Sequence, residues 1–277
     1  MGTKQIRVGE LNFHVVDEGK GPATLLLHGF PDSSALWRNQ IPALVNAGLR
    51  VVAPDLRGFG ASDKPTEVEA YALPAILQDA VGLLDKLGIE RAHVVSHDWG
   101  AAVGWMLASL CPERVDRFVA LSVGNLNGFW QAGLDQREKS WYMLLFQFRG
   151  LAEQILTRDD WKLFRNFVRH HSETEKWIED LARPGALTAA LNWYRANAGP
   201  EVFLAEPQLL PNVQAPTLAV WSGWDAYLTE APVVRSAEWV SGPWRYERLE
   251  GASHWMQLDQ PARLNALLVE FLTGDLT

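Results

Sequence analysis

Asp98 is the residue of this chain with the clearest chemical potential, because of its place in the run Ser96-His97-Asp98-Trp99-Gly100. Apolar residues lead into this run, and the small side chains two positions to either side of Asp98 permit a strained strand-to-helix turn that exposes its tip. A carboxyl group with an ordinary pKa of about 4 is an anion at neutral pH. Asp98 could therefore displace a leaving group from saturated carbon directly, whereas a serine would first need a base. The run predicts a nucleophile for alkyl rather than acyl chemistry.

Asp98 also has a second interpretation, as the N-cap of the helix that we expect over residues 99–110. Aspartate is a favoured cap because its side chain accepts a hydrogen bond from the first free amides of a helix. The short pattern alone leaves both interpretations open, and the residues that would complete a catalytic site decide between them.

A nucleophile that forms an ester needs a second group to break that ester, normally a histidine that activates water. His254 lies in a loop of small residues after the last expected strand, at the carboxyl edge of the sheet where sites form in open α/β folds. Asp225 follows the preceding strand directly, at the same edge. We expect His254 to be the base and Asp225 to fix its tautomer through a hydrogen bond. The alternatives are a loop histidine bonded to backbone and an ordinary turn aspartate.

The elements that must position these groups alternate between short strands and longer helices, which is typical of a mainly parallel sheet covered on both faces. Several of the strands are almost entirely apolar, as buried parallel strands are. We expect strands over residues 6–8, 12–16, 24–27, 50–53, 93–96, 117–122, 217–221 and 244–249, and helices over 35–46, 73–87, 99–110, 232–240 and 261–272.

The rhythm changes between residues 125 and 206, where helical periodicity replaces the strands. This segment holds 13 of the 29 Phe, Trp and Tyr residues, which predicts an all-helical cap with its own aromatic core. We therefore divide the chain into a first core part over residues 1–124, a cap over 125–206 and a second core part over 207–277.

Composition excludes several other classes of protein. The net charge of −8 without clustered Lys and Arg argues against nucleic acid as a partner. Cys111 is the only cysteine, so the chain has no internal disulfide. The first residues lack the apolar core of a signal peptide, and no apolar run approaches the ~20 residues of a membrane span. We expect a cytoplasmic protein.

Three motifs give the chain a specific resemblance. From about residue 5 to the last helix it resembles the epoxide hydrolases of the α/β-hydrolase superfamily, whose fold has an eight-stranded, mainly parallel sheet and an inserted helical cap. The matching runs are His28-Gly29-Phe30-Pro31, Asp55-Leu56-Arg57-Gly58-Phe59-Gly60-Ala61-Ser62 and Ser96-His97-Asp98-Trp99-Gly100.

The resemblance implies further site residues. The backbone amides of Phe30 and Trp99 would form the oxyanion hole, which holds the charge that develops when water attacks the ester carbonyl. Opening an epoxide leaves an alkoxide, which departs poorly unless an acid donates to its oxygen. Epoxide hydrolases use two cap tyrosines for this, and the resemblance places them at Tyr142 and Tyr194. The alternative for both tyrosines is packing in the cap core. Residues around Asp55 have a structural role in this interpretation.

Two other enzyme classes share features of this chain. Haloalkane dehalogenases carry the same nucleophile followed by Trp, but typically place Asn where this chain has Phe30, and halide needs no proton from a tyrosine. Haloacetate dehalogenases place Arg where this chain has Trp99. A ligand receptor on a hydrolase scaffold would have little need for Asp98, His254 and Asp225 together with both tyrosines. We favour epoxide hydrolysis, with dehalogenation and ligand reception as alternatives.

The expected ligands follow from the residues near the nucleophile. An apolar pocket suits a small hydrophobic or aryl epoxide, which would react with water. His170 and His171 lack a second pair of ligands, so we expect no metal, and the chemistry requires no cofactor. The sequence leaves open whether the protein forms a homodimer. The residues that we expect to contact substrate are Trp99, Phe30, Trp255, Met256, Phe129 and Trp130.

Overall fold

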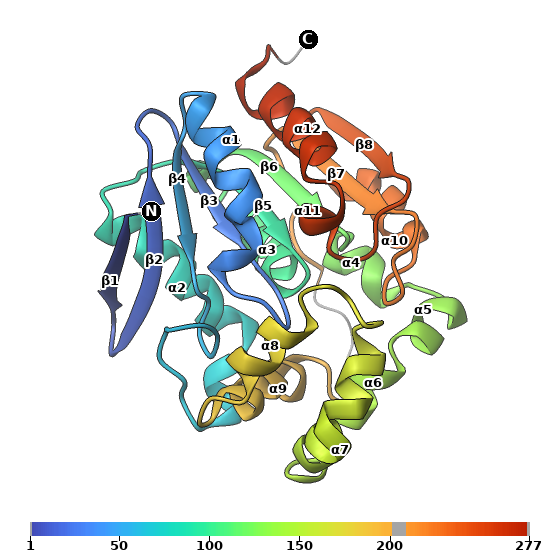
Figure 1. The fold of residues 1–277 in the computed structure, drawn as a ribbon. Coiled ribbons are helices and arrows are strands. Elements are labelled where there is room, and N and C mark those ends of the chain that lie inside the picture. Colours follow the sequence, from blue (N-terminus) through green and yellow to red (C-terminus); the bar gives the residue numbers. More distant parts are fainter. Residues whose placement is uncertain (1, 201–208, 276–277) are drawn as a thin grey trace.

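The fold is built on one sheet of eight strands in the order β1-β2-β4-β3-β5-β6-β7-β8 (Figure 1). The structure, a computed structural model, describes residues 2–200 and 209–275 together with their side chains, except that of Trp130. β2 pairs antiparallel with β1 and β4, and the remaining pairs are parallel. All eight predicted strands are confirmed, at β1 Thr3–Val8, β2 Leu11–Glu18, β3 Ala23–Leu27, β4 Arg50–Pro54, β5 Ala92–His97, β6 Val115–Leu121, β7 Thr217–Ser222 and β8 Trp244–Leu249.

The central strands carry the site because their apolar sequences bury them on both faces. Every residue of β5 and of β7 is buried, and β5 lies between β3 and β6. Parallel strands end at the same edge, so the loops that follow β3, β5, β7 and β8 meet there. The sequence places Asp98, Asp225 and His254 in three of these loops.

Helices cover both faces of the sheet. α1 and α12 pack together over one face, and α2 and α3 over the other (Figure 1). The core helices are α1 Gln40–Asn46, α2 Leu73–Lys86, α3 Trp99–Leu110, α10 Glu230–Arg235, α11 Met256–Asp259 and α12 Pro261–Thr273, with short 3-10 turns η1 Ser34–Asn39, η2 Val68–Tyr71, η3 Pro112–Arg114 and η5 Ser236–Trp239.

Two of the predicted core helices are each divided in the structure. The helix expected over residues 35–46 is a 3-10 turn followed by α1, because Pro42 lacks an amide hydrogen and is tolerated only in the first turn of an α-helix. The helix expected over 232–240 begins earlier, at Glu230, and ends where Ser236 donates its hydroxyl to the carbonyl of Pro232 at 2.9 Å.

The described part of the segment between β6 and β7 contains six helices joined by short turns, and its residues 209–216 are not helical. Arg195 of this segment is buried and donates to Glu153 at 2.9 Å and to the carbonyl of Phe146, which joins three of the helices. The cap boundary predicted at residue 206 lies outside the described residues. The helices are α4 Leu126–Trp130, α5 Leu134–Lys139, α6 Trp141–Phe146, α7 Leu151–Phe167, α8 Thr174–Leu181 and α9 Ala186–Asn197.

Among the helices within residues 2–200 and 209–275, none is both long and apolar enough to cross a membrane.

Candidate active site

Asp98 sits at the tip of a strained turn between β5 and α3. Its backbone has φ 53° and ψ −126°, a conformation that costs a non-glycine residue on the order of 1–3 kcal/mol and persists only where the surroundings enforce it. Gly100 allows the turn to lie against β3, since a Cβ there would meet the carbonyl oxygen of Leu27 at 2.3 Å. Asp98 stands at the N-cap position of α3, but its side chain makes no capping hydrogen bond there, so capping does not account for this residue.

The Asp98 carboxylate instead faces backbone amides on both sides. The amide of Phe30 donates to its Oδ1 at 2.8 Å, and the amide of Trp99 also donates to it. Burial alone would raise the pKa of Asp98, but the hydrogen bond and charge of His254 hold that pKa below its ordinary value. Asp98 is therefore a partly buried carboxylate anion, and the two amides predicted as the oxyanion hole already bind it.

His254 bridges the two carboxylates. Its Nε2 lies 3.5 Å from Asp98 Oδ2, and its Nδ1 lies 2.8 Å from Asp225 Oδ2. The other oxygen of Asp225 accepts from the amides of Tyr227 at 2.8 Å and Leu228 at 2.9 Å. Burial alone would lower the pKa of His254, but the charge and hydrogen bond of Asp225, aided by Asp98, raise it to about 10. The structure thus brings together the three residues that the sequence predicts as a triad.

A second histidine, His97, contacts both the ring and the backbone of His254. His97 Nε2 lies 2.9 Å from the backbone carbonyl oxygen of His254, and the two rings pack with centroids 4.5 Å apart. Burial lowers the pKa of His97 to about 3, so its ring is neutral and donates to that carbonyl. The sequence places His97 beside the nucleophile, on β5, but contains no local signal for this contact with a loop 157 residues away.

The glycine-rich loop with Asp55 has the expected structural contacts. Asp55 is buried, and its two oxygens accept from the amides of Ser34 and Ala61, each at 2.8 Å. These bonds hold the loops after β3 and β4 against each other.

Tyr142 of α6 and Tyr194 of α9 belong to the cap and line the same cavity as Asp98. Both are buried, and their rings pack edge to face with centroids 5.8 Å apart. Burial, together with the charge of Asp98, raises the pKa of each tyrosine well above its ordinary value. Both hydroxyls therefore keep their protons at neutral pH and can act as hydrogen-bond donors.

A cavity of about 430 Å³ lies between sheet and cap, and Asp98 and both tyrosines line it. Most of the remaining lining is apolar, which suits a hydrophobic ligand. The lining residues other than Asp98 and the two tyrosines are Leu73, Trp99, Ala102, Val123, Leu126, Phe129, Ala132, Gln136, Arg137, Ser140, Trp141, Met143, Leu144, Asn197, Ala198, Gly199, Pro200 and Leu228.

The six residues predicted to contact substrate are placed differently from one another. Trp99 and Phe129 line the cavity. Phe30 does not, because its ring packs into an aromatic cluster with Phe146, Phe164, Phe167 and Tyr194.

Trp255 and Met256 do not line the cavity either. The indole of Trp255 packs against Trp177 and the ring of His254, and Met256 is fully buried. The side chain of Trp130 lies outside the described part of the chain. Residues 252–256 thus fix the loop that carries His254 rather than surround the cavity.

No three His, Cys, Asp or Glu side chains gather as metal ligands within the described ranges 2–200 and 209–275.

Comparison with known proteins places this site in a family. Residues 22–261 match the family described as the alpha/beta hydrolase fold, so the chain belongs to that family and is a hydrolase. Among curated relatives, epoxide hydrolase A of Mycobacterium tuberculosis is 34% identical and is matched over 99% of both chains. Epoxide hydrolase 3 of Xenopus tropicalis is 33% identical over 96% of this chain and 76% of its own.

Solved structures agree with the sequence relatives. Epoxide hydrolase A from Mycobacterium thermoresistibile superposes with a TM-score of 0.83 at 30% identity, over 99% of this chain and 98% of its own. A Bacillus megaterium epoxide hydrolase in complex with an inhibitor gives a TM-score of 0.88 at 27% identity, over 97% and 99% of the two chains. The predicted fold class and superfamily are thereby confirmed.

Proposed function

We propose that this hydrolase converts an apolar epoxide and water into a vicinal diol through an ester on Asp98. The observation that carries the proposal is the pair of protonated tyrosines that line the same apolar cavity as a carboxylate nucleophile. The epoxide hydrolases among its relatives support the same substrate class.

Ring opening is the first step. A carboxylate oxygen of Asp98 attacks one ring carbon, a C–O ester bond forms, and the ring C–O bond at that carbon breaks. The oxygen that departs stays on the neighbouring carbon and receives a proton through Tyr142 or Tyr194, which prevents a free alkoxide. The tyrosine recovers a proton from solvent, and His254, protonated in the resting site, releases its own proton once the ester has removed the charge of Asp98. Asp98, His254 and the epoxide thus become an ester, a neutral imidazole and a hydroxyl group.

Ester formation prepares the base for the second step. Asp98 loses its negative charge in the ester, so one of the two carboxylates that hold the pKa of His254 high disappears. The neutral imidazole then takes a proton from water, and the hydroxide attacks the ester carbonyl carbon. The amides of Phe30 and Trp99 would hold the oxyanion. Collapse releases the diol and restores both the Asp98 carboxylate and the His254 imidazolium.

Halide release is the closest competing reaction for this nucleophile. The Phe30 side chain offers no donor for a departing halide, and its ring is occupied in the aromatic cluster. A paired screen of styrene oxide and bromoalkanes, reading diol against released halide, discriminates the two reactions. Halide release without diol formation would refute epoxide hydrolysis.

Isotope labelling and one variant test the ester itself. A single turnover in heavy-oxygen water should put label into Asp98, because the diol takes its new oxygen from the carboxylate. Label found only in the diol would exclude the ester. His254→Gln should still be alkylated but not hydrolysed, so its intact mass should rise by one substrate. Consumption of substrate by this variant with an unchanged protein mass would contradict the assignment of His254.

A further inference from the structure

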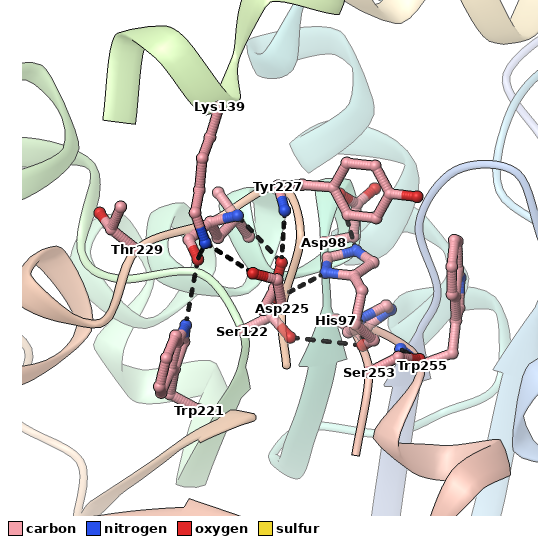
Figure 2. A network of polar contacts seen from close by, with 12 residues as sticks. His97, Asp98, Ser122, Lys139, Trp221, Asp225, Tyr227, Thr229, Ser253 and Trp255 are labelled. Carbon is pink, nitrogen blue, oxygen red and sulfur yellow. Dashed lines mark hydrogen bonds and ion pairs between the residues drawn. The ribbon is translucent and has the colours of Figure 1, made fainter. Parts of the chain in front are cut away.

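The loop that carries Asp225 is held from the cap as well as from the sheet. Figure 2 shows Lys139 reaching from the end of α5 toward Asp225, with Tyr227 and Thr229 on the same loop. Lys139 Nζ donates to the backbone carbonyl of Asp225 at 2.6 Å and to that of Leu228 at 3.2 Å.

Gln136, one helical turn before Lys139, makes the complementary contacts. Its amide nitrogen donates to the carbonyl of Tyr227 at 2.9 Å, and its amide oxygen accepts from the backbone amide and hydroxyl of Thr229 at 2.8 and 2.9 Å. Gln136 is only 3% exposed, so these bonds are sheltered from water and a lost partner would leave a buried group unsatisfied. Five hydrogen bonds therefore join this one short helix to residues 225–229.

Tyr227 adds a contact from another part of the cap. Its hydroxyl donates to the carbonyl of Phe167, at the end of α7, at 2.5 Å, and its ring packs edge to face on the imidazole of His254 with centroids 5.2 Å apart. Its own amide is one of the two that hold Asp225 Oδ1. Residues 225–229 thus orient the Asp225 carboxylate, contact the His254 ring and bind the cap.

The rest of the cap is attached elsewhere. Trp177 of α8 donates to Asp32, and Trp193 of α9 donates to the carbonyl of Arg57, so this half is fixed to the loops after β3 and β4. Gln136 also lines the cavity that contains Asp98. Any movement of α5 that accompanies ligand entry must therefore move, or break from, the loop that carries Asp225.

We propose that Lys139 and Gln136 are positioning residues that hold Asp225, and through it His254, in place for ester hydrolysis. The inference rests on the proposed function, in which alkylation needs the Asp98 carboxylate and hydrolysis additionally needs an oriented imidazole. Losing the contacts from α5 slows hydrolysis and leaves alkylation largely intact. Coupling α5 to the triad in this way makes turnover depend on a closed cap.

The test separates the two half-reactions with styrene oxide as the probe. Rapid mixing and quenching followed by intact-protein mass measurement gives the rates at which the ester appears and disappears. Lys139→Met should form the ester at the wild-type rate and hydrolyse it up to about a hundredfold more slowly, the loss expected when a catalytic group is displaced by about 1 Å. The ester should accumulate, and Lys139→Arg should restore part of the hydrolysis rate.

Controls keep the outcomes distinct. Lys162→Met, at an exposed position of α7, should leave both rates unchanged. If Lys139→Met does not fold, Gln136→Glu keeps the acceptor for Thr229 and removes the donor to Tyr227, and it should show the same accumulation. Wild-type hydrolysis in these variants, or an equal loss in both half-reactions, would overturn the inference. Absence of an ester in His254→Gln would instead refute the proposed function.

Discussion

Gly29 provides the sharpest test of the nucleophile geometry, through the change Gly29→Ala. The φ of Gly29 lies outside the left-handed region, so an alanine would meet no backbone strain there. Its Cβ, however, would lie 2.2 Å from Asp98 Oδ1 and 2.6 Å from Asp98 Cγ. Such contacts must lengthen to at least 3.0 Å, which moves the carboxylate by about 0.8 Å relative to the loop that bears the Phe30 amide.

The displacement is large enough to measure as a rate. It disturbs the 2.8 Å hydrogen bond from Phe30 and the direction of attack, so we expect the rate of ester formation to fall by up to about a hundredfold. The assay is the single-turnover appearance of the styrene oxide ester in the His254→Gln background, followed by intact mass. Gly133→Ala is the matched control, since a Cβ there meets nothing within 4 Å and its φ is −72°. If folded Gly29→Ala were alkylated at the rate of the control, the proposed packing of Gly29 against the Asp98 carboxylate would be refuted.

Two predictions concern stability. Arg195→Met removes the buried partner of the partly buried Glu153, so the free energy of unfolding should fall by about 1.5–3 kcal/mol in urea titrations, and an unchanged value would mean that the pair contributes nothing. His254 has a folded pKa near 10 against an ordinary 6.5, so its interactions with Asp98 and Asp225 stabilise the fold fully below pH 6.5 and progressively less as pH rises toward 10. Between pH 7 and 10 the wild type should therefore lose more unfolding free energy than His254→Gln, and parallel curves would contradict the assigned pKa direction.

The sequence predicts those parts of the molecule whose signals are local. Strands β5 and β7 are mostly apolar. Asp98 follows β5 directly and Asp225 comes soon after β7, so their meeting at one sheet edge could be inferred from periodicity and chain order. Pro42 divides a predicted helix because its missing amide hydrogen outweighs the apolar pattern around it.

The contacts that support the triad could not be predicted in this way. Gln136 and Lys139 meet Tyr227 and Asp225 across 86 to 91 residues, and in sequence they are ordinary polar positions of a short helix. Trp255 resembles a substrate contact because it neighbours His254, yet its indole packs against Trp177. Which way an aromatic side chain points near a site is decided by tertiary packing.

The strand order also determines how the site responds to partial unfolding. The nucleophile is carried by an interior strand, with neighbours on both sides, whereas the base follows β8 at the margin of the sheet, where only β7 supports it. Marginal strands detach at lower free energy than interior ones. Under mild denaturing stress, fraying of β8 removes the base while the nucleophile is still held. Such a chain would form the ester with one molecule of substrate and could not hydrolyse it. Local unfolding of β8 would therefore turn the enzyme into a protein that binds substrate covalently only once.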